Sequence, residues 1–147
     1  MTDPDPASTL VSALPFPKHI GIKPNEDGAL VLAENQSLYN HLGTLHAGAL
    51  FTLGESASGA TVLRQLGQAL AGATPVAKSA TIEYRKPARG RIRAGGSLDE
   101  AVEEIAARLQ RDRKTTFDVR VTLQDDAGVE VAAMKVTWYV RADGPGG

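Results

Sequence analysis

The chain of 147 residues suits one domain with one hydrophobic core, and its 42% hydrophobic and 22% charged residues are ordinary for a globular protein. A formal net charge of −1 gives no reason to propose binding to nucleic acid or to an anionic membrane, and the lack of cysteine excludes disulfides and thiolate chemistry. Residues 1–12 do not resemble a signal peptide, and no stretch approaches the roughly 20 apolar residues that span a bilayer, which favours a cytoplasmic protein.

The first third of the chain predicts a short helix followed by a β-hairpin. We expect residues 1–6 to be disordered and residues 7–14 to form a helix that prolines stop. Residues 19–23 and 29–33 are typical of two strands, because a turn signal at 25–28 separates them. Residues 36–45 show no clean period and predict a loop.

The segment 47–65 predicts one long helix. Leu50, Leu53, Ala57 and Ala60 recur at helical spacing, no proline interrupts them, and small residues crowd the segment. Because each glycine costs roughly 1 kcal/mol against alanine in a helix interior, so many small residues indicate close packing on all sides. We therefore expect a buried central helix.

The remaining chain predicts strands and one further helix. A loop at 67–74 precedes strands at 76–84 and 91–98, and a capping-box pattern at 97–100 predicts a helix over 99–111 in which Glu104 pairs with Arg108. Strands at 116–124 and 129–140 flank a tight turn. This order predicts an α+β fold with a largely antiparallel sheet. The expected boundaries are an N-terminal extension over 1–14, one domain over 15–141 and a flexible tail over 142–147.

One motif carries a resemblance to a known family. The stretch N-x-x-G-T-L-H-A-G at residues 40–48, followed by Glu55, resembles the signature of hotdog-fold acyl-CoA thioesterases of the phenylacetate-pathway (PaaI) type. Residues 82–90 and the hairpin at 125–138 also look like those of YiiD C-terminal-like hotdog domains. The resemblance covers roughly residues 15–141. It implies a hotdog fold, in which an antiparallel sheet wraps around one long central helix, and an enzyme that hydrolyses acyl-CoA thioesters.

Site residues follow from this resemblance and from elementary chemistry. Backbone N–H groups at a helix N-terminus are unpaired and lie at the positive end of the dipole, where a thioester oxygen gains stabilisation. The resemblance assigns this role to the N–H of Ala47. It makes Glu55, the only acidic residue between Glu34 and Glu83, the nucleophile or general base. Asn40 is expected to contact the substrate or the attacking water, and His46 to orient the loop rather than act as a base.

Simpler roles stay open for these residues. Glu55 suits a structural carboxylate, and Asn40 suits a turn cap. The sequence also departs from the family: Ala47 replaces the usual Gly, the PaaI type mostly has Asp where this chain has Glu55, and Gly59 stands where the Glu-containing branch often has Ser or Thr. The chain thus mixes features of two branches, and the acyl group cannot be transferred from either.

Basic residues offer a place for the phosphates of CoA, which enters as part of the substrate and not as a cofactor. Arg85, Arg89 and Arg91 follow the strand that ends at residue 84, and Arg forks suit phosphate oxygens. A second candidate cluster lies at residues 111–114, and a solvated rim is the alternative for both. No His and carboxylate show metal-ligand spacing, and we expect no metal.

The expected fold leaves a groove and a sheet edge open, which predicts a homodimer or a dimer of dimers. By resemblance, Asn40 and the Ala47 amide of one subunit would face Glu55 of the other. Two other functions remain in view: an acyl-CoA-binding hotdog protein without catalysis, and a hotdog dehydratase or hydratase. The last is disfavoured because dehydratases carry a Pro-Gly turn before the helix, and residues 46–48 lack it.

Overall fold

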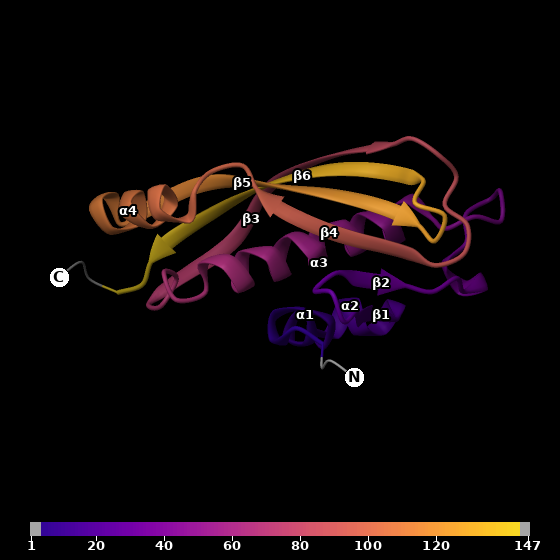
Figure 1. Cartoon of the computed structure of the whole chain (residues 1–147), viewed down its shortest axis with the longest axis horizontal. Coiled ribbons are helices and arrows are strands. Elements are labelled where there is room, and N and C mark those ends of the chain that lie inside the picture. Colours follow the sequence, from indigo (N-terminus) through magenta and orange to yellow (C-terminus); the bar gives the residue numbers. More distant parts are fainter. Residues whose placement is uncertain (1–3, 145–147) are drawn as a thin grey trace.

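A computed structural model describes residues 4–144, in which a curled antiparallel sheet covers one long helix (Figure 1). The six strands lie in the order β1-β2-β4-β5-β6-β3. This arrangement is the hotdog fold that the resemblance implies. The elements along the chain are α1 (Pro6–Ser12), α2 (Pro15–Ile20), β1 (Ile22–Pro24), β2 (Leu30–Leu32), the 3-10 helix η1 (Gln36–Leu38), α3 (Ala47–Leu66), β3 (Ala73–Tyr84), β4 (Ile92–Leu98), α4 (Val102–Asp112), β5 (Lys114–Asp125) and β6 (Glu130–Ala142).

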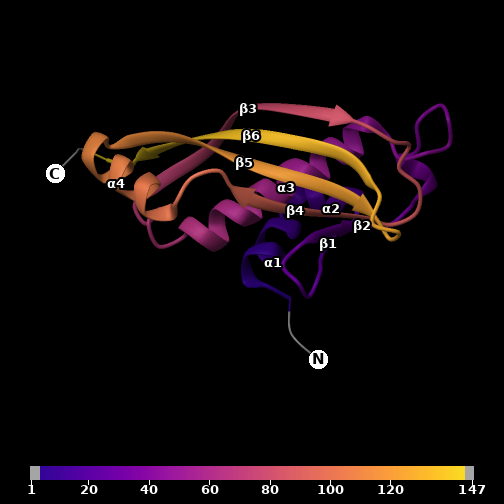
Figure 2. The same ribbon diagram turned by 45° about the horizontal axis from the view of Figure 1, so that its top comes forward.

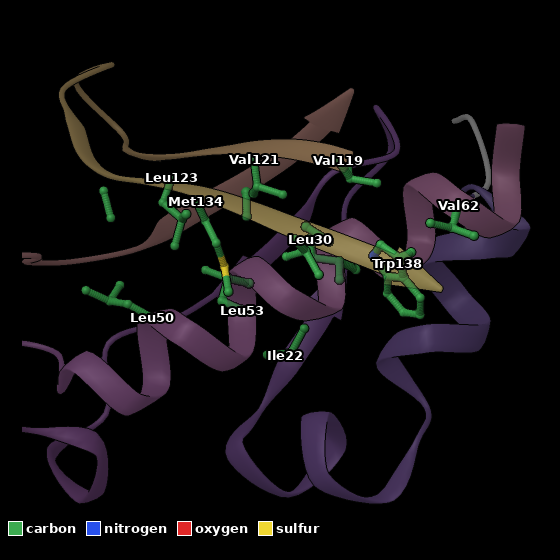
Figure 3. Close-up of a cluster of buried hydrophobic side chains, with 14 of the residues drawn as sticks. Ile22, Leu30, Leu50, Leu53, Val62, Val119, Val121, Leu123, Met134 and Trp138 are labelled. Carbon is green, nitrogen blue, oxygen red and sulfur yellow. The ribbon is translucent and has the colours of Figure 1, made fainter. Parts of the chain in front are cut away.

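The helix α3 confirms the predicted central helix, with 11 of its 20 residues buried. Its small residues let the sheet approach closely: a Cβ at Gly54 would lie 2.6 Å from the sulfur of Met134 on β6. Figure 3 shows the side chains that fill this layer, with Leu50 at one end and Val62 and Trp138 toward the other. The position of α3 is therefore determined by close contact of its small residues with the sheet, and not by a division of the helix into an apolar and a polar face.

The strands β5 and β6 form the hairpin that the alternating pattern predicts. Phe117, Val119, Val121 and Leu123 are buried, and the side chains between them are half-buried or exposed. The turn is held by the Asp125 carboxylate, which accepts hydrogen bonds from the N–H groups of Ala127 (3.0 Å) and Val129 (2.9 Å). Alternation was the strongest local signal in the chain, because one face of these strands meets α3.

The N-terminal residues differ from the prediction. Asp5 and Pro6, expected to be disordered, cap and begin α1, while residues 1–3 lie outside the described part. The expected strand over 19–23 is wrong in its first half, because α2 extends to Ile20 and Gly21 ends it in a left-handed conformation (φ 92°). In two views α1 and α2 lie on the side of α3 that faces away from β5 and β6 (Figures 1 and 2).

The predicted start of α4 is also wrong. Ser97 and Leu98 stay paired with β5, so the capping box does not form, and the helix begins at Val102 with no side-chain cap. The expected pair of Arg108 with Glu104 is replaced by a two-pronged ion pair of Arg108 with Glu100 (2.6 and 3.0 Å). At these residues the pairing of β4 with β5 determines the structure, although the local sequence favours a helix. Of the helices in residues 4–144, none is long and apolar enough to cross a membrane.

Candidate active site

The N-terminus of α3 presents one unpaired N–H group. His46 caps the helix: its Nδ1 accepts a hydrogen bond from the N–H of Gly48 (2.8 Å), and its carbonyl oxygen accepts from Ala49 and Leu50 (2.9 and 3.1 Å). Within the described chain, the N–H of Ala47 has no partner. It lies at the positive end of a 20-residue helix, where negative charge is stabilised.

The hydrogen bond from the Gly48 N–H also determines the tautomer of a neutral His46 ring. Because Nδ1 accepts from a backbone N–H, a neutral imidazole carries its proton on Nε2. The side chain of His46 is exposed, and its hydrogen bond joins the loop before α3 to the first turn of the helix. Its free nitrogen is a donor in this tautomer and not a base.

Asn40 is engaged within its own loop. Its side-chain carbonyl accepts from the N–H groups of Leu42 (2.9 Å) and Thr44 (3.1 Å), and its amide donates to Thr44 Oγ1 (2.8 Å) and to the Leu45 carbonyl (3.4 Å). Both ends of the side chain are used, as in the turn-capping role. Asn40 nevertheless lines the same pocket, about 290 Å³ in volume, as Ala47.

Tyr84 belongs to this pocket and was not singled out as a site residue by the sequence. Its hydroxyl donates to the carbonyl oxygen of Ala47 (3.1 Å), which ties the end of β3 to the start of α3. Burial raises the pKa of this phenol above its usual value. The alternation of Ala80, Ile82 and Tyr84 indicated a shared strand face, but nothing in the sequence indicated the contact with α3.

Glu55 lies in a second and more apolar pocket, about 470 Å³ in volume. Its side chain is half-buried, and no described residue forms an ion pair or hydrogen bond with its carboxylate. Loss of solvation raises the pKa of Glu55 above the ordinary value of 4.5. A carboxylate held this way is a better base near neutral pH than an exposed one.

Two serines that follow Glu55 have different surroundings. The Ser58 hydroxyl donates to the Glu55 carbonyl (2.6 Å) and accepts from Nε1 of Trp138 (3.1 Å). The Ser56 hydroxyl, in contrast, is buried without a hydrogen-bond partner in the described structure, and Ser56 lines the pocket of Glu55. At Gly59 a Cβ would lie 3.7 Å from the Trp138 ring, an ordinary contact.

The predicted residues therefore fall into two groups in one chain. Asn40 and Ala47 share the first pocket, and Glu55 lies in the second. Glu55 lies eight positions after Ala47, which is about 12 Å along the helix axis. A carbonyl bound to the Ala47 N–H within the first pocket would lie in a pocket that Glu55 does not line.

The predicted phosphate contacts are distributed unevenly. Arg85 lines the pocket of Ala47, but it pairs with Glu83 (3.3 Å) and Glu130 (2.5 Å). Lys86 lines the same pocket, whereas Arg89 and Arg91 do not. In residues 4–144 no three His, Asp or Glu side chains lie close enough together to bind a metal ion.

Three solved structures place this arrangement among known proteins. PA5026 from Pseudomonas aeruginosa, a protein of unknown function described as a probable thioesterase, is 26% identical with a TM-score of 0.80, covering 97% of this chain and 100% of that one. BH2602 from Bacillus halodurans, solved with CoA, is 24% identical with a TM-score of 0.63, covering 77% and 66%. The Streptococcus mutans protein smu.793, bound to acetyl-CoA, is 22% identical with a TM-score of 0.60, covering 80% and 82%.

The match to PA5026 confirms the resemblance to hotdog proteins of the thioesterase superfamily. No curated protein sequence matches the chain. One protein family does match, over residues 17–140, which is most of the sequence. The chain belongs to that family, DUF4442, which is described as a domain of unknown function.

Proposed function

We propose that this protein hydrolyses an acyl-CoA or a related thioester to a free acid and a thiol. The observation that carries the proposal is Glu55, a half-buried carboxylate without a partner in the described chain, whose pKa burial raises. An unpaired carboxylate costs free energy in such surroundings, and groups perturbed in this way are concentrated at functional sites. The thioesterase description of PA5026, which matches over its whole length, supports the same reaction class.

In the proposed reaction Glu55 acts as a general base on water. The water oxygen attacks the thioester carbon while its proton passes to Glu55, and the carbonyl oxygen becomes an oxyanion that the Ala47 N–H stabilises. The tetrahedral intermediate collapses, the carbon–sulfur bond breaks, and the sulfur takes the proton from Glu55. Water is the only co-reactant, and CoA enters as part of the substrate. A nucleophilic Glu55, which would form an acyl anhydride, is the alternative from the same position.

The separation of the two pockets supports a site that two subunits share. We propose a homodimer in which the Ala47 N–H of one subunit faces Glu55 of its partner. The strand β3 supports this, because within residues 4–144 its 12 residues pair only with β6 and leave an edge for a second chain. A dimer of dimers remains compatible with this arrangement.

The CoA part of the substrate is proposed to lie outside the first pocket. BH2602 was solved with CoA and smu.793 with acetyl-CoA, which supports a CoA thioester as the ligand class. Arg85 and Lys86 line the pocket rim and are proposed to contact phosphate oxygens, with Arg89 and Arg91 as further candidates in the adjoining segment. The ion pairs of Arg85 are solvent-exposed and therefore weak enough to exchange for a phosphate.

Binding of acyl-CoA without hydrolysis is a second candidate, and one observation favours it. The Asn40 side chain, which is expected to reach the substrate or water, is fully used by its own loop. A site that has lost this contact would still hold an acyl-CoA. Thiol release from the wild-type protein separates the two candidates.

The test compares wild type with Glu55→Gln on a panel of short, long and aromatic acyl-CoAs, by following free thiol. Removal of a general base is expected to lower kcat by about 10²–10⁴-fold. Glu26→Gln, which changes an exposed carboxylate in the β1–β2 turn, serves as the matched control and should keep full activity. Equal turnover by Glu55→Gln and wild type would remove Glu55 from the mechanism.

A further inference from the structure

The pocket that holds Glu55 is closed on one side by the N-terminal helices. Its wall includes Leu10 and Leu14 from the α1 region and Phe16 from α2. Glu55 is the only ionisable side chain among its lining residues, and its volume of about 470 Å³ lies within the range of roughly 300–1,000 Å³ that is usual for small-molecule sites. The composition fits an uncharged, apolar ligand.

The shape of the pocket follows α3. Its lining residues on this helix run from Thr52 to Leu63, eleven steps of the helix or about 16 Å along the axis. Trp138 closes the side near Gly59, and Figure 3 shows Trp138 toward the same end of the buried cluster as Val62. The pocket is therefore elongated, with Glu55 nearer the end that Thr52 marks.

The N-terminal wall is fixed to α3 and is not a loose extension. The guanidinium of Arg64 donates from Nε to Asp5 (3.1 Å) and from Nη2 to Ser8 Oγ (3.1 Å) and the Gly28 carbonyl (2.7 Å). Ser8 also donates to the Gly28 carbonyl (2.6 Å). One side chain of α3 thus joins α1 and the β1–β2 turn, so the wall has a defined position.

Two observations indicate that a ligand completes this pocket. The Ser56 hydroxyl, in a residue only 2% exposed, has no hydrogen-bond partner among residues 4–144, and a buried unpaired hydroxyl is costly. In addition, four of the nine exposed large hydrophobic side chains of the described chain line this pocket. They are Leu10, Leu14, Phe16 and Leu63. A polar atom beside Glu55 and apolar surface further along match the two ends of an acyl thioester.

We infer that this pocket holds the acyl group of the substrate, that the group is an aliphatic chain of medium length, and that the α1–α2 wall sets the accepted length. The inference rests on the proposed function. The thioester end lies beside Glu55, where the Ser56 hydroxyl bonds a polar atom of the substrate or the attacking water. The chain extends along α3 toward Val62 and Trp138.

A series of straight-chain acyl-CoAs from acetyl to palmitoyl tests the inference through kcat/KM. We expect kcat/KM to rise about four-fold per added methylene until the pocket is filled, and then to level off. The double variant Leu10→Ala/Leu14→Ala should lower the ratio of octanoyl-CoA to acetyl-CoA activity by about ten-fold. Val129→Ala removes an exposed apolar side chain from the β5–β6 turn, outside this pocket, and should leave the ratio unchanged.

The variant Gly59→Leu keeps the test decisive if the double variant fails to fold. A side chain at residue 59 projects beside Trp138, and leucine is a better helix former than glycine. It should shorten the preferred chain. Variants that change the oligomeric state but not the length profile would assign the apolar wall to a subunit interface and overturn the inference.

Binding is measured separately from turnover, because Trp138 is the only tryptophan of the chain. The thioether S-(8-bromooctyl)-CoA cannot be hydrolysed, and its bromine should quench Trp138 fluorescence in a saturable way that S-octyl-CoA does not reproduce. Quenching without thiol release from any acyl-CoA would overturn the proposed function and keep the pocket. The opposite outcome is that thiol is released while the bromine does not quench Trp138 and the wall variants leave the length profile unchanged. That result would overturn the assignment of this pocket to the acyl group and keep the proposed function.

Discussion

The surroundings of Glu55 make its protonation part of the stability of the fold. Loss of solvation raises the pKa of this carboxyl above 4.5, so the folded protein holds the proton more tightly than the unfolded chain does. Protonated Glu55 therefore makes a contribution to the free energy of unfolding. This contribution is fully present below pH 4.5 and is lost as the pH rises through the folded-state pKa.

We expect Glu55→Gln to have a larger free energy of unfolding than wild type at about pH 8, with a difference that closes toward pH 4.5. Urea unfolding of both proteins across this pH range measures the difference. A difference that stays constant with pH would mean that Glu55 is not desolvated in the assembled protein.

Ser56 and Ser58 lie two residues apart on α3 and should respond in opposite ways to the same change. Ser56→Ala removes a buried hydroxyl without a partner in the described chain and should stabilise the fold by up to about 1 kcal/mol. Ser58→Ala leaves Nε1 of Trp138 without its acceptor and should cost about 1–3 kcal/mol. Thermal unfolding of both variants checks this, and a loss of stability in Ser56→Ala would contradict it.

The sequence could identify Glu55 because a lone carboxylate within an apolar helix is visible from composition alone. It could also place Ala47 at a helix N-terminus. It could not show that Asn40 is used by its own loop, that Tyr84 reaches the Ala47 carbonyl, or that Ser56 rather than Ser58 is unpaired. Those facts depend on distances between elements, which residue spacing does not determine.

Contact between α3 and β4 explains why two adjacent glycines on β4 should differ. A Cβ at Gly96 would lie 2.5 Å from Thr61 Oγ1 and 3.4 Å from the Arg120 carbonyl, whereas a Cβ at Gly95 would meet nothing within 4 Å. We expect Gly96→Ala to destabilise the fold by about 1–3 kcal/mol, and Gly95→Ala to change it by less than about 1 kcal/mol. Chemical denaturation compares them.

A second change tests the cause of this difference. Thr61→Ala removes the atom that a methyl group at residue 96 would strike, so it should be less harmful in the Gly96→Ala background than in wild type. Purely additive effects of the two changes would exclude the proposed clash. The prediction concerns the packing of a helix on a sheet, because neither Thr61 nor Gly96 lines either of the two candidate site pockets.

Elements with a regular hydrophobic period could be predicted from the sequence. Elements at which two local sequence signals disagree could not. The strand β5 alternates over its whole length because one face meets the core. Pro15 and Pro17 suggest the end of a helix, but Pro15 begins α2, because proline is favoured in the first turn of a helix. The start of α4 was misplaced because the pairing of Leu98 with Val119 extends the strand through the capping-box pattern.

At the scale of the molecule, the order of elements and the motif together predicted the hotdog fold, but not how the N-terminus completes it. The ion pair of Arg64 with Asp5 spans 59 residues, and nothing local in the sequence marks it. Leu10, in the wall of the Glu55 pocket, lies on α1, the helix that Asp5 caps. If the inferred wall sets the accepted acyl length, that length depends on tertiary contacts that a residue pattern does not contain.

The proposed division of the site between two subunits leads to a prediction about the whole assembly. Ala47→Pro deletes the unpaired N–H at the first helical position, where proline is well tolerated, and the extended conformation of His46 (φ −63°, ψ 143°) suits a following proline. The variant should fold normally and lose about 10²–10³-fold in kcat. Glu55→Gln removes the other half of the proposed site.

Heterodimers isolated through two affinity tags then distinguish a shared site from one within a chain. If each site takes Ala47 from one subunit and Glu55 from the other, a heterodimer of Ala47→Pro with Glu55→Gln has one intact site and about half the wild-type activity. A heterodimer of wild type with the double variant has one defect in each site and should be nearly inactive. The reverse pair of results would place the whole site in one chain, since only the wild-type subunit would then be active.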